Sequence, residues 1–326
     1  MPFDPHIRPV NLRKDLAAIA DLVDVCFSPT MDVEGFDYLR HIRQIAGSMG
    51  MYLSETATPE NSHLPFQGYV WVEDGKLIGN LTLINVRKGE RGHYLIANVA
   101  THPAQRGRGI ARQLTARAIA HVREHNGKKI FLQVREDNPT AHNIYKDFEF
   151  TEDTRRTTYV NAGAGRWSAP DLTPGVEVTR RRREDWDMQM KWLAETHGSY
   201  AWNMPLQISR FEPGFWPALS VYLQGGVLRS WSVRQAGELI GAATWEKGIS
   251  VADYLWIGTS NEHDDVVIRA LLPEVRRALF NRKFQVNYPA DRGSQAFLES
   301  DMKKVHTLIW MSREISTEPE LSLQLF

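Results

Sequence analysis

The run of residues 99–111, Val-Ala-Thr-His-Pro-Ala-Gln-Arg-Gly-Arg-Gly-Ile-Ala, constrains the fold more than any other part of the chain. It follows an apolar segment, 94–99, that has the character of a strand, and it leads into residues 110–122, where apolar side chains recur at helical spacing. Gly107 and Gly109 permit backbone angles that are closed to other residues, so successive amide N–H groups can converge on an anion. The sequence therefore predicts a strand, an anion-binding loop and a helix in that order.

Two familiar phosphate loops do not match this run. A Walker loop needs a lysine after its last glycine, and Ile110 follows Gly109; a dinucleotide loop needs a glycine where the chain has Arg112. Arg106 and Arg108 carry guanidinium groups, which suit phosphate oxygens better than lysine does. The positive end of the following helix favours an anion at the same place.

The pattern Arg-x-x-Gly-x-Ala over residues 106–111 resembles the acyl-CoA pyrophosphate loop of the GNAT superfamily of N-acetyltransferases. A second segment, 138–150, is similar to the other CoA-side motif of that family, Asn-x-x-Ala-x-x-x-Tyr-x-x-x-Gly-Phe. The matching residues are Asn138, Ala141, Tyr145 and Phe150. The segment departs from the motif at Glu149, where the family has a glycine at a helix exit.

The resemblance implies a mixed α/β fold in which the strand before the loop bulges and splays from its neighbour, leaving a wedge for acetyl-CoA. It implies direct transfer of an acetyl group to an amine, with Tyr145 as the acid that assists the departing thiolate, and with no metal. The expected cofactor-binding residues are Val99, Thr101, Arg106, Gly107, Arg108, Gly109, Ile110, Ala111 and Asn138. The bulge would free backbone groups of Val99 and Thr101 for the pantetheine amides.

The general base stays open at this stage. Many relatives place a glutamate on the strand of the first motif, but residues 94–101 contain no carboxylate. The possible bases are His93, Glu73, Asp137 and the acidic cluster Asp32, Glu34 and Asp37, with a water molecule relaying the proton. The acidic cluster could also attract a cationic amine.

Two halves of the chain resemble each other in the order of their local signals. The hairpin turn at residues 74–79 recurs at 236–241, and the strand, loop and helix of 94–122 correspond to 253–279. We therefore expect two tandem GNAT-like domains, each a twisted mixed sheet flanked by helices. The expected boundaries are 1–160 for a catalytic acyl-CoA-binding domain, 161–175 for a Gly- and Pro-rich linker, and 176–326 for a second domain.

The second half has lost the residues that would bind and use the cofactor. Asp264 and Asp265 stand opposite Arg106 and Gly107, Val267 stands opposite Gly109, and Phe297 stands opposite Tyr145. Two carboxylates would repel a pyrophosphate, and phenylalanine offers no proton. The second domain is thus predicted to be a degenerate copy, so that one chain binds one acyl-CoA.

The charge composition gives no support for a nucleic-acid or membrane partner. Acidic and basic residues are balanced at 39 each, so no net charge draws the chain to nucleic acid or to an anionic membrane. The run Arg180 to Arg183 is interpreted as surface charge, and the single cysteine, Cys26, as a packing residue. We expect a cytoplasmic N-acetyltransferase that acts on a small-molecule or peptide amine; the alternative is a protein that binds acyl-CoA as a sensor or scaffold without catalysis.

Overall fold

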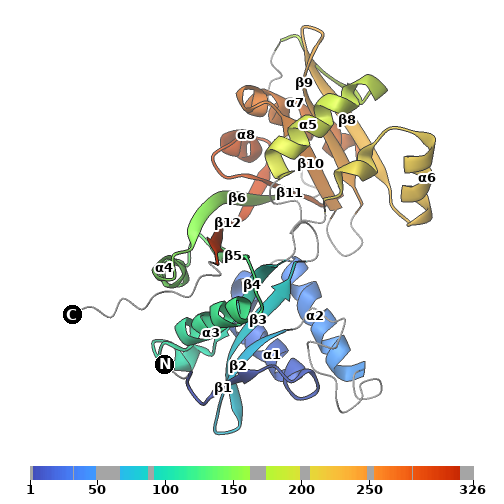
Figure 1. The fold of residues 1–326 in the computed structure, drawn as a ribbon. Coiled ribbons are helices and arrows are strands. Elements are labelled where there is room, and N and C mark those ends of the chain that lie inside the picture. The colour runs from blue at the N-terminus through green and yellow to red at the C-terminus, as the bar shows by residue number, and fades with distance from the viewer. Residues whose placement is uncertain are drawn as a thin grey trace. The chain divides into compact units, whose positions relative to one another are not determined.

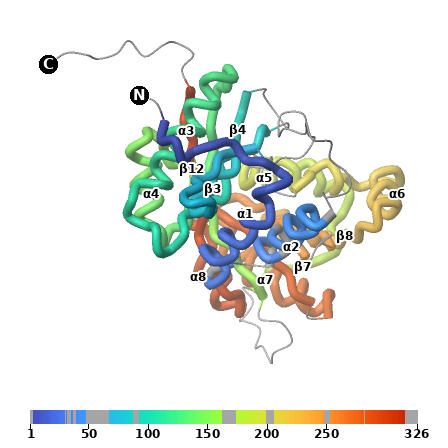
Figure 2. Tube along the Cα trace, turned by 90° about the horizontal axis from the view of Figure 1, so that it is seen from below, coloured from blue at the N-terminus to red at the C-terminus, as the bar shows by residue number. Residues whose placement is uncertain are grey.

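The computed structural model describes residues 3–31, 33–48, 67–86, 92–161, 174–198, 206–247, 253–280 and 282–315. The chain divides into two compact units, one formed by residues up to Asp153 together with those from Ile309 on, the other by Thr154–Leu308. Each unit is a mixed sheet with helices, as the sequence predicts. The course of the chain through each unit can be followed from blue to red in Figures 1 and 2.

The first unit contains a largely antiparallel sheet with one parallel pair. In chain order its elements are β1 (Ile7–Pro9), α1 (Leu12–Phe27), α2 (Val33–Ser48), β2 (Gln67–Glu73), β3 (Lys76–Asn85), β4 (His93–Thr101), α3 (Ile110–Glu124), β5 (Lys129–Arg135) and α4 (Pro139–Asp147). The strand order is β1-β2-β3-β4-β5, and β12 (Met302–Glu314) follows β5. Only the β4 and β5 pair is parallel among the pairings of these five strands.

Helices cover both faces of this sheet (Figure 1). Alternate residues of β2 point to opposite faces: Tyr69 and Trp71 belong to the core under α3, and Val70 belongs to the core under α1 and α2. The predicted apolar face of α3 is confirmed, since Ile110, Leu114, Ala118 and Val122 are all buried. Among the described residues, no helix is both long and apolar enough to cross a membrane.

The second unit repeats the plan of the first. Its elements are β6 (Thr151–Asn161), β7 (Val176–Arg180), α5 (Trp186–His197), α6 (Phe215–Leu223), β8 (Leu228–Gln235), β9 (Glu238–Glu246), β10 (Asp253–Thr259), α7 (Asp264–Ala278), β11 (Phe284–Pro289) and α8 (Ser294–Glu299). The strand order is β6-β11-β10-β9-β8-β7. Its core lies mainly between the sheet and α7.

The hairpin turns of the two units support the predicted repeat. Asp74 and Gly75 connect β2 to β3 with φ angles of 49° and 74°. Ala236 and Gly237 connect β8 to β9 with φ angles of 50° and 85°. Two successive residues in the left-handed region are what a tight two-residue hairpin turn requires.

The last strand of each half of the sequence completes the unit formed by the other half. From Thr154 on, β6 belongs to the second unit, where it pairs with β11. From Ile309 on, β12 belongs to the first unit, where it follows β5. The predicted boundary at residue 160 therefore differs from the division by contacts, and most of the predicted linker lies outside the described residues.

Candidate active site

The end of β4 has the bulge that the resemblance implies. Its register against β3 shifts between Asn80 and Thr82, where Asn98 adopts a left-handed φ of 50°. β4 pairs with β5 only as far as Ile96, opposite Leu132, although both strands continue beyond this pair. The two strands thus part, and backbone groups of the last residues of β4 are not used by the parallel ladder.

Asn80 holds this bulge, and sequence reasoning missed it. Its side chain is fully buried, and its Nδ2 donates to the carbonyl oxygen of Asn98 at 3.0 Å. The signal was available, because an amide side chain in the middle of an apolar strand needs a buried partner.

The predicted anion loop joins β4 to α3. His102 anchors the start of the loop, where its amide donates to the Ile78 carbonyl at 2.9 Å. Gly107 and Gly109 have φ angles of 81° and 77°, and a Cβ added to either would meet no atom within 4 Å. The glycines are therefore required by backbone conformation, and the space beside them is open to a ligand.

The N-terminus of α3 presents its amides at this loop. Gly109 is the N-cap and contributes no side chain, and its carbonyl accepts the amide of Gln113 at 3.0 Å. Gln113 is the first residue of α3 whose amide binds a carbonyl of the same helix. The amides of Ile110, Ala111 and Arg112 come before it in the chain and have no acceptor within the helix. Such an end, with its partial positive charge, suits a phosphate group.

The two arginines of the loop have different surroundings. Arg108 forms a two-pronged ion pair with Glu73 at the end of β2, with N to O distances of 2.7 and 2.9 Å. Arg106 is exposed and lies near Cys26, whose thiol donates to the Thr101 carbonyl at 3.3 Å. Burial raises the pKa of this thiol, and Arg106 opposes the shift.

The second motif lies on α4, which contacts the first turn of α3. Asn138 caps α4 by accepting the amide of Ala141 at 3.1 Å, as its sequence position predicts. Arg112 of α3 pairs with Asp147 at the end of α4 at 2.6 Å. The structure thus brings the loop-bearing helix and the tyrosine-bearing helix together.

Tyr145 is buried among apolar side chains. Its ring is 6% exposed and meets Phe150 edge to face, with 6.0 Å between the ring centroids. Among the described residues its hydroxyl has no hydrogen-bond partner. Burial raises the pKa of Tyr145, so the phenol stays protonated well beyond neutral pH.

Glu149 shows why a glycine is expected at its position. It leaves α4 in the left-handed region, with a φ of 61°, which costs a non-glycine residue about 1 kcal/mol or more. Its carboxylate pairs with Arg313 of β12 at 2.9 Å. The departure from the motif is thus accommodated at the helix exit.

Two of the side chains considered as general bases are occupied by arginines. Glu73 is held by Arg108, whose guanidinium lowers the pKa of that carboxyl. Asp137 accepts two hydrogen bonds from Arg135, at 2.8 and 2.7 Å. A carboxylate with a lowered pKa is a weak proton acceptor, so the geometry disfavours Glu73 as a base.

The structure does not place any of the remaining candidate bases at the bulge: one lies far along the strand, and the others fall outside the described residues. His93 begins β4, about 16 Å along the strand from the bulge, and its ring packs against Phe131. Asp32 lies outside the described residues, as do the side chains of Glu34 and Asp37. The base is unassigned.

We predict that Glu73→Gln keeps turnover within about threefold of the wild type, whereas loss of a general base costs about a hundredfold or more. Because the amide frees Arg108 for phosphate, affinity for CoA should stay equal or rise. Steady-state kinetics and CoA titration measure both quantities. A drop in turnover of a hundredfold with unchanged CoA affinity would assign the base to Glu73.

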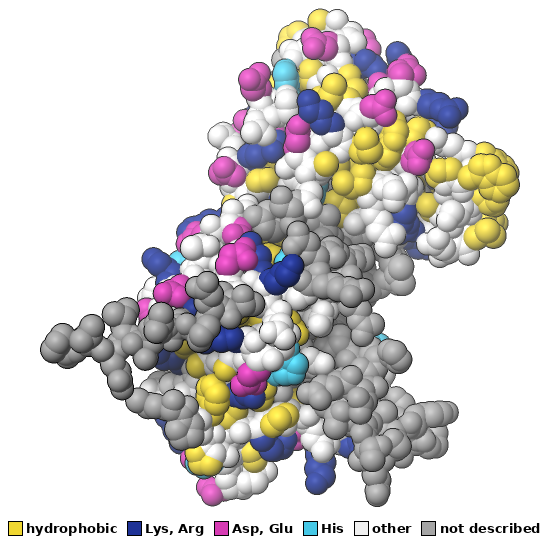
Figure 3. All heavy atoms as spheres, viewed as in Figure 1, with side chains coloured by type: hydrophobic (Ala, Val, Ile, Leu, Met, Phe, Trp, Pro, Cys, Tyr) yellow, Lys and Arg dark blue, Asp and Glu magenta, His cyan; other side chains and the backbone are white. Residues whose placement is uncertain are grey.

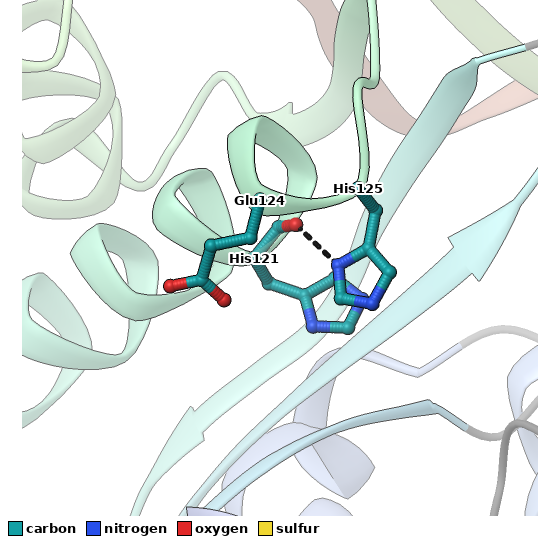
Figure 4. A group of neighbouring side chains, drawn as sticks. All are labelled: His121, Glu124 and His125. Atoms are coloured by element: carbon teal, nitrogen blue, oxygen red, sulfur yellow. Dashed lines mark hydrogen bonds between the residues drawn. The ribbon is translucent and has the colours of Figure 1, made fainter.

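A group of possible metal ligands lies at the far end of α3 (Figure 4). Side-chain atoms of His121, Glu124 and His125 lie within 4.8 Å of one another. Nδ1 of His121 hydrogen-bonds to the Tyr69 hydroxyl at 2.9 Å, and Nδ1 of His125 donates to the His121 carbonyl at 2.7 Å. Arg117 pairs with Glu124. These contacts account for the three side chains, and the expectation of no metal stays a prediction.

Over residues 253–280, all of which the structure describes, the second unit has no open loop at the corresponding place. β10 pairs with β9 without a register shift over its described length. α7 already begins at Asp264, which stands opposite Arg106, whereas α3 begins only at Ile110. The positions that form the loop in the first unit are therefore helical in the second.

An internal ion pair lies at the start of α7. Both carboxylate oxygens of Asp264 bind Arg292, at 2.6 and 2.7 Å, and the Tyr288 hydroxyl donates to the same group at 2.7 Å. Asp264 is buried. A carboxylate thus takes the place at the helix N-terminus that an external anion would need.

The other two substitutions in this half are packing residues. Val267 is fully buried, and a Cβ on Gly241 would come within 2.6 Å of it, so it packs on the sheet and does not face an open loop. Phe297 is fully buried and stacks on Tyr159, with 4.4 Å between the ring centroids.

Comparisons with known proteins agree with this geometry. Residues 36–150 match the model of the acetyltransferase (GNAT) family. A GCN5-related N-acetyltransferase from Sphaerobacter thermophilus is similar over 99% of each chain, with a TM-score of 0.61 and 14% identity. A tandem GNAT protein from the clavulanic acid biosynthesis pathway, determined without acetyl-CoA, is similar over 96% of this chain and 99% of its own, with a TM-score of 0.52 and 15% identity. A search of curated proteins gave no significant match.

Proposed function

We propose that this chain is a tandem GNAT protein and that it acetylates a primary amine with acetyl-CoA; the family-model match over residues 36–150 and the shared fold support this proposal. The amine of a small molecule or peptide attacks the thioester carbonyl, a C–N bond forms and the C–S bond breaks. The amine loses one proton and the CoA thiolate gains one. No covalent intermediate on the protein is needed.

The observation that carries the proposal is the combination of the β4 bulge with the loop of residues 106–111 at one end of the sheet. The loop offers amides and the guanidinium of Arg106 to a pyrophosphate, and the bulge offers backbone groups of Val99 and Thr101 to the pantetheine arm. Asn138 and Tyr145 lie on the adjacent helix. In this assignment Tyr145 donates a hydrogen bond to the leaving sulfur.

The same argument gives one acyl-CoA per chain. Among the described residues of the second unit, β10 has no bulge against β9. The ion pair of Asp264 with Arg292 occupies the N-terminus of α7. Titration of the full chain with CoA should give a stoichiometry of one. A stoichiometry of two would overturn the degenerate assignment of the second unit.

The activity is tested by thiol release from acetyl-CoA against polyamines, amino acids, aminoglycosides and peptide N-termini. Release that depends on one of these amines supports the transferase. Tight CoA binding with a flat response across the panel favours the sensor or scaffold instead.

The pH dependence follows from the burial of Tyr145. Because the folded-state pKa of Tyr145 is raised above its usual 10.0, its protonated form persists as the pH rises through that value. We expect turnover to rise as the amine substrate loses its proton and not to fall before about pH 10. A fall of the rate with a midpoint near pH 8 or 9, in a protein still folded by circular dichroism, would contradict the role of Tyr145.

A further inference from the structure

The four-arginine run of the second unit lies beside a cavity. Arg180 ends β7, and Arg181 and Arg183 follow it at the turn into α5; all three line a cavity of about 980 Å³. Arg182, in the middle of the run, does not line the cavity; its guanidinium Nη1 lies 3.9 Å from Oε1 of Glu184. The run is thus more than scattered surface charge, because three of its four side chains share one hollow.

The cavity has more positive charge than its own carboxylates balance. Arg210 and Arg229 also line it, and Glu212 is the one acidic residue among the described lining residues. Arg210 is neutralised by an ion pair with Glu246. With Glu212 offsetting one further arginine, three positive charges are left uncompensated.

Neutral oxygens hold two of these arginines in place. Arg181 donates to the Gln189 side chain and to the Phe211 carbonyl, both at 2.7 Å, and Arg229 donates to the Ala278 carbonyl. A neutral acceptor fixes a guanidinium without cancelling its charge. Within the described residues, Arg180 and Arg183 form no ion pair at all.

The remaining walls are apolar. Val221 and Trp231 are buried at the edge of the cavity, and Leu228 is partly buried. Tyr222 of α6 lies at its rim and is 76% exposed. Figure 3 shows hydrophobic side chains gathered over α6. A volume of this size, with apolar walls and a few convergent polar groups, is typical of a small-molecule site.

We propose that this cavity binds a small organic anion with an apolar body, a phosphate or carboxylate on a short alkyl or aryl group. The arginines supply planar donors that match either head group, and Trp231 and Leu228 receive the apolar part. The cavity lies at the start of β8, where Leu228 pairs with Glu246 at the end of β9. The N-terminus of α7 follows Thr259, which pairs with Gly241 near the start of β9. The cavity is therefore separate from the helix terminus that corresponds to the cofactor site.

The test is calorimetric titration of the full chain with hexyl phosphate, hexanoate, 1-hexanol and inorganic phosphate. The two amphipathic anions should bind at one site, at least about tenfold more tightly than hexanol or inorganic phosphate. Hexanol lacks the anionic head group, and inorganic phosphate lacks the apolar part. Whichever of hexyl phosphate and hexanoate binds more tightly identifies the head group. Saturating CoA should not displace them, because the pyrophosphate loop is elsewhere.

Neighbouring arginines provide the matched control. Arg183→Gln should weaken hexyl phosphate about tenfold, and Arg180→Gln with Arg183→Gln more than that, whereas Arg182→Gln should leave the affinity within about twofold. All three residues are exposed, so the variants should fold. Equal weakening by Arg182→Gln, displacement by CoA, or no binding of either amphipathic anion overturns the proposal.

Discussion

Replacing Gly109 by valine is expected to weaken CoA binding by at least about a hundredfold, because the loop loses several charge-assisted hydrogen bonds to the pyrophosphate. A Cβ added to Gly109 meets no protein atom within 4 Å, so the valine side chain would start into the open space that the ligand needs. Calorimetric titration with CoA measures the loss.

The backbone strain of this variant needs its own control. Gly109 has a φ of 77°, and a β-branched residue there costs about 1–3 kcal/mol of stability. Gly75 has a φ of 74°, and its Cβ would also meet nothing within 4 Å, but it lies in the turn between β2 and β3. Gly75→Val should therefore match the loss of thermal stability and keep CoA affinity. Unchanged affinity in a folded Gly109→Val protein would remove the cofactor assignment from this loop.

Local patterns predicted the scaffold of the site well. The helical spacing after Gly109 identified the face of α3 that packs on the sheet, because burial of one stripe is what a surface helix requires. Gly127 follows the end of α3, at a position where a glycine is common, and its amide donates to the Val122 carbonyl at 2.7 Å. The left-handed residue there is Asn126, however, and Gly127 is needed because any Cβ would lie within 2.2 Å of Val122.

Contacts between distant segments could not be predicted in the same way. The pairing of Arg108 with Glu73 joins residues 35 positions apart, and no periodicity links them. The partner of Asp264 is Arg292, so the sequence predicted repulsion of an anion but not its internal replacement. The two halves of the sequence also resemble each other locally, which hides the placement of β6 and β12 in units formed by the opposite halves.

Replacing Tyr145 by phenylalanine is expected to lower turnover by about a hundredfold or more, with CoA affinity little changed. The hydroxyl has no partner among the described residues, so its removal leaves no buried group unpaired and should cost little stability. The second unit carries this change naturally, since Phe297 stands opposite Tyr145 and packs in a full core. The loss of rate should therefore come from chemistry and not from folding.

Tyr94→Phe is the matched control, because Tyr94 is a second buried tyrosine of the same core and lies on β4. It should keep turnover within about twofold, since Tyr94 is the second residue of β4 and the bulge lies at Asn98. Single-turnover measurements on any active amine separate the chemical step from product release. Equal turnover of Tyr145→Phe and the wild type would reduce Tyr145 to a packing residue.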